Sequence, residues 1–338
     1  MASLSALLCF VRENGFEHPT EGREEEACSL MSEIDPALAR LLRWRTLRDL
    51  FLRLPSATVE KFALLYPVTK DGWLQSQFQR ILGQTIVAVD AHFHWDKLKG
   101  SLPLNLPSPA PYHLLFSVAN YCFPEQWGKS SQLSNDWVFL SFGVHPSRAG
   151  AEDSQCSLME DLKLLLGGPK VVAIGEIGLD YSPRYDTENR LRQRLLFRHL
   201  LRLGVSLKLP IVVHCRGYGD EEAELDCLKI MRKEVPRFHP IHRHCFLGTP
   251  QEINQWLGVF PNSVFGITPK ISSKVYHSYR DVLPLQQTVL ESDAPYIARS
   301  PGHLSSLAVM MAQTQGCSVE ELLGTTASTA IRFYKLPF

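Results

Sequence analysis

Residues 85–94 read TIVAVDAHFH, a short apolar, β-branched run that ends in two histidines separated by one residue. The run is too hydrophobic to have a solvent face, which is typical of a parallel strand covered on both sides. Alternate residues of a strand point to the same side, so His92 and His94 are expected to face the same way. A doubly wound open sheet usually carries a glycine-rich turn after its first strand, where this chain has histidine.

Seven further strand-like runs follow along the chain. They are HLLFSVA (113–119), WVFLSFGV (137–144), VVAIGE (171–176), LPIVVHC (209–215), IHRHCF (241–246), SVFGIT (263–268) and TVLESD (288–293). Helices are predicted between some of them, over 189–203 and 221–235. Eight such strands over about 250 residues fit an α/β fold of the (β/α)8 TIM-barrel type in number and in length. The doubly wound open sheet is the structural alternative.

The composition excludes several classes of protein. The 338 residues are 45% hydrophobic and 21% charged, which is typical of a globular chain with a sizeable core. Lys plus Arg and Asp plus Glu both count 35, so a protein that coats nucleic acid by bulk positive charge is excluded. The sequence contains no apolar run of about 18 residues, so no membrane span is predicted. The 8 cysteines form no C-x-x-C pair, which favours free thiols in a reducing compartment, so an intracellular, cytoplasmic or nuclear protein is expected.

Residues 1–85 differ from the rest and predict a helical N-terminal extension. Asp35 and Pro36 have the pattern of a helix start, and leucines recur at three-to-four spacing up to Pro55. Residues 1–34 include an acidic stretch for which disorder is one reading. The arginines within 36–54 form the clearest local basic cluster. They favour either a helix packed on the barrel with a solvated face or a site for a protein partner or phosphate.

Residue types that bind metals stand at the ends of the predicted strands. They are His92 and His94 after the first strand, Glu176 after the fourth, His214 after the fifth, His244 after the sixth and Asp293 after the eighth. In a barrel the carboxyl ends of the strands converge on one mouth, so these side chains are expected to meet. Four imidazoles and two carboxylates exceed what one tetrahedral zinc needs and suit two cations about 3.5–4 Å apart. Taken singly, each histidine also fits a hydrogen-bonded core residue, and Asp293 before Ala-Pro fits a turn.

Six segments at these positions resemble the TatD family of metal-dependent deoxyribonucleases, which have an amidohydrolase-type barrel. They are VDAHFHWD, FGVHP, AIGEIGLDY, LPIVVHCR, HCFLG and LESDAPYI, and the resemblance covers residues 86–338. The resemblance implies that His92, His94 and Glu176 hold a first metal. It also implies that Glu176 bridges to a second metal, which His214 and His244 complete, with Asp293 beside the first.

The resemblance further implies a 3′→5′ exodeoxyribonuclease that acts in DNA repair or degradation, with abasic-site cleavage as a second activity. Two divalent cations would activate a water, and Glu176 and Asp293 would be the catalytic carboxylates, with Asp293 as general base. Mg²⁺ is the expected metal, although an imidazole-rich site also accepts Zn²⁺ or Mn²⁺. DNA is the expected substrate and RNA stays open.

Three further residues near the mouth are candidates for binding substrate phosphate: His145, Arg216 and Lys270. Loop packing and a surface ion pair are the alternative readings of the first two. Cys215 and Cys245 each follow an expected ligand, and strand alternation predicts that both point into the core. The chain departs from the family pattern after His145-Pro146, after Arg216 and after the DAPY segment, in loops expected to contact nucleic acid.

Two other functions remain open on sequence alone. A hydrolase of a small ester, amide or phosphoester would use the same fold and metal site, since fold does not determine function. A catalytically silent interaction protein is the third reading, in which the N-terminal helix is the working part.

Overall fold

A computed structural model of the chain describes residues 87–98, 112–133, 138–150, 155–218 and 222–336. The predicted N-terminal extension, residues 1–85, and its arginine cluster at 36–54 lie outside the described residues. Within the described part, no helix is long and apolar enough to cross a membrane.

One sheet of eight parallel strands forms the centre of the molecule, in the sequential order β1 to β8. The strands are β1 (Val87–Phe93), β2 (His113–Tyr121), β3 (Val138–Phe142), β4 (Val171–Asp180), β5 (Ile211–Arg216), β6 (Ile241–Arg243), β7 (Ser263–Ile267) and β8 (Thr288–Leu290). Each of the eight predicted runs overlaps one of these strands. The (β/α)8 prediction is therefore confirmed, and the open doubly wound sheet is wrong.

The sheet curls into a nearly closed barrel, and its two edges meet just beyond the end of β8. The Asp293 N–H donates to the His92 carbonyl at 3.0 Å, and the His94 N–H donates to the Ala294 carbonyl at 2.8 Å. Buried Asp90 strengthens this junction by accepting hydrogen bonds from the backbone N–H groups of Ser292 and Gly302 at 2.9 and 2.8 Å. The closure places the end of β1 directly beside Asp293.

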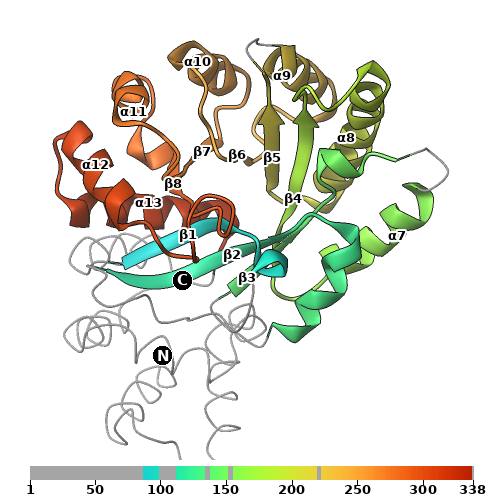
Figure 1. Ribbon diagram of the computed structural model, residues 1–338, viewed down its shortest axis with the longest axis horizontal. Coiled ribbons are helices and arrows are strands. Elements are labelled where there is room, and N and C mark those ends of the chain that lie inside the picture. Colours follow the sequence, from blue (N-terminus) through green and yellow to red (C-terminus); the bar gives the residue numbers. More distant parts are fainter. Residues whose placement is uncertain (1–86, 99–111, 134–137, 151–154, 219–221, 337–338) are drawn as a thin grey trace, which may run out of the picture.

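The helices lie on the outer side of the strands, as Figure 1 shows for α8 to α11. They are α7 (Gln155–Leu166), α8 (Thr187–Leu207), α9 (Glu222–Glu234), α10 (Pro250–Val259), α11 (Ser273–Tyr279), α12 (Ser305–Gln315) and α13 (Val319–Tyr334). The two helices predicted over 189–203 and 221–235 correspond to α8 and α9. Among the described residues, short 3₁₀ turns rather than α-helices follow β1 and β2, at Trp95–Lys97 and Pro124–Gln132.

Helix starts follow local capping chemistry. The Asp186 carboxylate accepts the Asn189 N–H at 2.8 Å and begins α8. Thr249 and Glu252 form a reciprocal capping box at the start of α10, with Pro250 at the first helical position. These two caps end the loops that follow β4 and β6, over 181–186 and 244–249.

Strands β4 and β5 approach each other closely at the level of the site. Gly178 pairs with His214 in the ladder, has φ +149°, and a Cβ there would overlap the His214 carbonyl. Only glycine fits this close approach without moving the backbone. The contact brings Glu176 of β4 and His214 of β5 side by side.

Candidate metal centre

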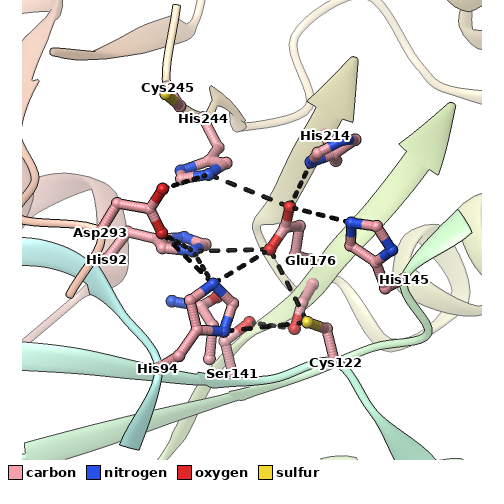
Figure 2. Close-up of polar contacts among 12 residues, drawn as sticks. His92, His94, Cys122, Ser141, His145, Glu176, His214, His244, Cys245 and Asp293 are labelled. Atoms are coloured by element: carbon pink, nitrogen blue, oxygen red, sulfur yellow. Dashed lines mark hydrogen bonds and ion pairs between the residues drawn. The ribbon is translucent and has the colours of Figure 1, made fainter. Parts of the chain in front are cut away.

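The six predicted ligands meet at the carboxyl ends of the strands (Figure 2). His92, Glu176 and His214 lie within β1, β4 and β5. His94 and His244 directly follow β1 and β6, and Asp293 lies three residues after the end of β8 at Leu290. All six side chains are buried, with residue exposures between 0% and 8%. Burial of so many polar groups at one point requires partners for each of them.

Glu176 lies at the centre of the cluster, and its two carboxylate oxygens face different histidines (Figure 2). Oε2 lies 3.6 Å from His92 Nε2 and 3.5 Å from His94 Nε2. Oε1 contacts His214 Nδ1 and lies 3.9 Å from His244 Nε2. Each carboxylate oxygen, together with the imidazole nitrogens on its own side, can therefore contribute to binding a divalent cation.

Asp293 lies against the first of these two groups. Its Oδ1 is 3.3 Å from His94 Nε2 and 3.9 Å from His92 Nε2, while its Oδ2 is 4.0 Å from His244 Nε2. The Nε2 atoms of His92 and His94 are themselves only 3.2 Å apart. Asp293 therefore contacts the same space as the His92–His94 pair and also faces His244.

His145 lies closer to the cluster than the sequence suggested. Its Nε2 is 3.9 Å from Glu176 Oε1, the same distance as His244 Nε2, and its ring lies against His214 with centroids 4.6 Å apart. The Nδ1 atom of His145 contacts Ser147 Oγ at 2.7 Å, which orients the ring. His145 is thus placed to bind either a cation or the phosphate beside it.

The electrostatics of the site follow from burial and from the mixture of charges. Burial raises the pKa of Glu176, but the neighbouring His214 and His244 outweigh it and hold this pKa well below its usual range. Burial lowers the pKa of His92 to about 4, with a further contribution from His244. Burial, followed by His214, lowers the pKa of His145 to about 3. The carboxylates beside His94 and His244 outweigh burial and raise the pKa of both imidazoles, so a divalent cation that binds there would displace protons.

Among the described residues, four groups of ligand atoms could hold a cation, and two of them include Glu176. One comprises His92, His94 and Glu176, and the other His145, Glu176 and His214, with the ligand atoms of each group within 4.8 Å of one another. The buried His214 Nε2 atom also has no hydrogen-bond partner. Nitrogen and carboxylate donors in this ratio suit Zn²⁺ and Mn²⁺, and the carboxylates also suit Mg²⁺.

A cavity of about 1060 Å³ opens above the cluster, which forms its floor. Arg216 and Lys270 line this cavity and are both exposed. Arg148 and Arg184 line it too, but each is paired with a carboxylate, of Glu125 and Asp180 respectively. Exposed cations above a cluster that can bind metals form a surface suited to a phosphate-bearing ligand.

The sequence missed two residues that contact the ligands. Cys122 is buried, with its Sγ 3.7 Å from Glu176 Oε2 and 3.9 Å from His94 Nδ1. It directly follows β2, so the rule that ligands stand at strand ends would have found it had the predicted strand not ended at residue 119. Glu291 is the second, and its Oε1 lies 3.1 Å from His244 Nδ1.

The prediction that Cys245 points into the core is wrong. β6 ends at Arg243, and Cys245 has φ +45°, so strand alternation does not extend to it. Its side chain is half-buried, lines the cavity and offers a sulfur within 4.8 Å of the ligand atoms of His244 and Asp293.

The chain is similar to known proteins over the whole barrel. Residues 89–335 match the family described as TatD related DNase. The human protein "3′-5′ RNA nuclease TATDN2" is 35% identical over 227 residues, which cover 62% of this chain and 28% of the human protein. The protein "Uncharacterized metal-dependent hydrolase YcfH" of Escherichia coli K12 is 30% identical over 210 residues, 60% of this chain and 75% of its own length.

The fold is similar to that of solved structures. A crystal structure of a hydrolase of the TatD family from Entamoeba histolytica has a TM-score of 0.58 and 21% identity, and the match covers 75% of this chain and all of that one (100%). At this identity the likeness supports the barrel fold alone.

Proposed function

This chain belongs to the TatD related DNase family, and from that premise we propose that it is a metal-dependent nuclease that hydrolyses phosphodiester bonds. The observation that carries the proposal is the shared carboxylate of Glu176, with imidazoles on each side, at the floor of a cavity with exposed cations. This arrangement serves phosphoryl transfer, in which charge on phosphate oxygens must be neutralised beside an activated water.

The finer form of the proposal is a 3′→5′ exodeoxyribonuclease with two divalent cations. Two ligand groups that share one carboxylate favour two cations over one. Mg²⁺ is the first candidate, with Mn²⁺ and Zn²⁺ as alternatives that the imidazoles favour. The human relative is named a 3′-5′ RNA nuclease while the family is named for DNase activity, so DNA is proposed as substrate and RNA is tested beside it.

Each residue has a proposed role. His92, His94 and Glu176 hold one cation, and Glu176, His214 and His244 hold the other. Divalent cations held by these residues would stabilise the charge on the phosphate oxygens and would lower the pKa of a bound water. Asp293 accepts the proton of the attacking water at Oδ2, the oxygen that lies further from the His92–His94 pair.

Three side chains would orient the substrate. Arg216 and Lys270 are exposed in the cavity lining and would bind the flanking phosphates by charge. His145, which is neutral because its pKa is lowered to about 3 by burial and by His214, would either donate a hydrogen bond to the scissile phosphate or join the second cation group.

The test uses single-stranded DNA and RNA oligonucleotides labelled at the 3′ or the 5′ end, incubated with purified protein and Mg²⁺ or Mn²⁺. Stepwise shortening from the 3′ end that disappears in Glu176→Ala and Asp293→Ala proteins is expected. If cation-loaded protein cleaves neither polymer but hydrolyses a small phosphoester, the proposed nuclease activity is wrong and the protein is a hydrolase of small molecules. Protein that binds no cation would refute both.

A further inference from the structure

A buried polar chain runs from the metal centre through the barrel wall to the C-terminal helix. His242 and Glu291 have 0% exposure and Tyr334 of α13 has 2%, yet none of the three takes part in the proposed reaction. A charged carboxylate and an imidazole inside a barrel are costly unless both are fully hydrogen-bonded. Their contacts therefore indicate why the chain keeps them.

Glu291 joins the two histidines at the end of β6. Its Oε1 lies 3.1 Å from His244 Nδ1 and 2.7 Å from His242 Nε2. Its Oε2 accepts the Cys245 N–H at 2.9 Å. Both oxygens are thus occupied by groups from the segment that carries His244.

Tyr334 closes the other end of the chain. Its hydroxyl lies 2.5 Å from His242 Nδ1 and 3.3 Å from the Ala91 carbonyl, so the shorter contact is with the imidazole. With the tyrosine O–H on His242 Nδ1, the proton of that ring lies on Nε2, which faces Glu291 Oε1 as an ion-pair contact without an aligned hydrogen bond. Glu291 accepts a hydrogen bond from His244 Nδ1–H, and the Nε2 lone pair of His244 is left to face Glu176 and Asp293.

Strand β7 leaves room for this arrangement. A Cβ at Gly266 would overlap the carboxylate of Glu291. Any larger residue there would push the carboxylate out of reach of the two imidazoles. The chain of contacts from Tyr334 through His242 to Glu291, called the relay below, therefore requires glycine at position 266.

His92 and His94 lack such support. The Nδ1 atom of His92 is buried without a hydrogen-bond partner, and that of His94 contacts only the Cys122 sulfur, at 3.9 Å. In sites where a histidine binds a metal, a carboxylate on its other nitrogen fixes the tautomer and the ring orientation. Of His92, His94 and His244, it is His244 that has a carboxylate, that of Glu291, on its Nδ1 atom.

We propose that Tyr334, His242 and Glu291 are positioning residues that fix His244 as an Nε2 donor, so that the C-terminal helix α13 controls occupancy of one cation position. The proposal rests on the proposed function only in assuming that His244 binds a cation. It does not require that the protein cleave nucleic acid.

The test is titration of the full chain with Mn²⁺ alone, followed by calorimetry, on wild-type, Glu291→Gln and Tyr334→Phe proteins. Glu291→Gln keeps the size but has one acceptor oxygen, so either the Cys245 N–H or both imidazoles on Oε1 lose their acceptor. We expect one class of Mn²⁺ site to weaken by about 10–100-fold in Glu291→Gln and by about tenfold in Tyr334→Phe. The other class of site should change little.

Tyr276→Phe is the matched control. Tyr276 is equally buried, and its hydroxyl accepts a hydrogen bond from Gln315 Nε2 at 3.1 Å, away from the metal centre. Both Tyr→Phe proteins should lose similar thermal stability, and Tyr334→Phe alone should lose Mn²⁺ affinity. Unchanged affinity in Tyr334→Phe, or an equal loss in Tyr276→Phe, would overturn the proposal even if Glu291→Gln fails to fold.

The same titration separates this inference from the proposed function. Wild-type protein that binds Mn²⁺ but cleaves neither DNA nor RNA would refute the nuclease and leave the relay intact. Cleavage of DNA or RNA by the wild-type protein, together with unchanged Mn²⁺ affinity in the Glu291→Gln and Tyr334→Phe proteins, would support the nuclease and refute the relay.

Discussion

Glu176 and Asp293 both bring a carboxylate to the metal centre, but their surroundings differ. Glu176 contacts histidines on both sides, whereas Asp293 lies beside one pair and turns its Oδ2 towards His244. We therefore expect Glu176→Gln to lose both cations and activity, and Asp293→Asn to keep its cations while kcat falls by about 10²–10⁴-fold. Metal content after dialysis and single-turnover rates test this. Equal metal loss in both variants would make Asp293 a ligand rather than the base.

Gly178 is a residue at which backbone shape and the site are coupled. Its φ of +149° and the overlap of a Cβ with the His214 carbonyl combine strain with a steric clash. Gly178→Ala should lower the free energy of unfolding by about 2–4 kcal/mol. Gly316→Ala is the control, since Gly316 has φ +70° and open space around a Cβ, so about 1–2 kcal/mol is expected there. If denaturant unfolding gives equal losses of free energy for Gly178→Ala and Gly316→Ala, strands β4 and β5 can move apart at little energetic cost.

At the scale of elements, one buried ion pair ties helix α9 to the ends of β5 and β6. Arg243 donates to both Glu224 oxygens at 3.1 and 3.0 Å and to the carbonyls of His244 and Cys215 at 2.8 Å each. Trp256 of α10 donates to Glu224 Oε1 at 2.5 Å. The guanidinium therefore fixes the backbone next to His214 and at His244.

This pair makes a pH-dependent contribution to stability. Burial raises the pKa of Glu224, but Arg243 outweighs it, so this pKa lies below the ordinary value of 4.5. The contribution is fully present above pH 4.5 and is lost as the pH falls through the lower, folded-state pKa. Glu224→Gln should cost about 3–5 kcal/mol at pH 7, because it leaves the Arg243 charge buried and unpaired. The difference from wild type should shrink below pH 4.5. A difference independent of pH from 7 to 3 would contradict the assignment.

The elements differ in how far sequence predicts them. The strands are predictable because both faces are covered and each run is apolar throughout, and the ligands because barrel strands end at one mouth. No local pattern links Glu224 to Arg243, 19 residues apart, or His242 to Tyr334, 92 residues apart. Cys245 was mispredicted because β6 ends two residues earlier, at Arg243, and the chain then turns through a left-handed conformation. Local sequence patterns therefore do not predict contacts between distant elements or irregular backbone conformations.

At the scale of the whole molecule, a net charge of zero predicts weak attraction to nucleic acid except where cations are concentrated. Within the described residues, Arg216 and Lys270 are exposed cavity-lining cations without a carboxylate partner, whereas Arg148 and Arg184 are paired.

If Arg216 and Lys270 contact two phosphates of a single strand, raising the salt from 50 to 200 mM should weaken binding by about sevenfold. Fluorescence anisotropy with the Asp293→Asn protein and a labelled oligonucleotide measures this slope. The Arg216→Ala/Lys270→Ala double variant should bind more weakly at low salt and lose most of the slope. Arg202→Ala, which removes an exposed arginine paired with Glu234 on the outer helices, should change neither. A steep slope that survives the double variant would instead assign nucleic-acid binding to another surface, because two rim cations cannot account for more than two phosphates.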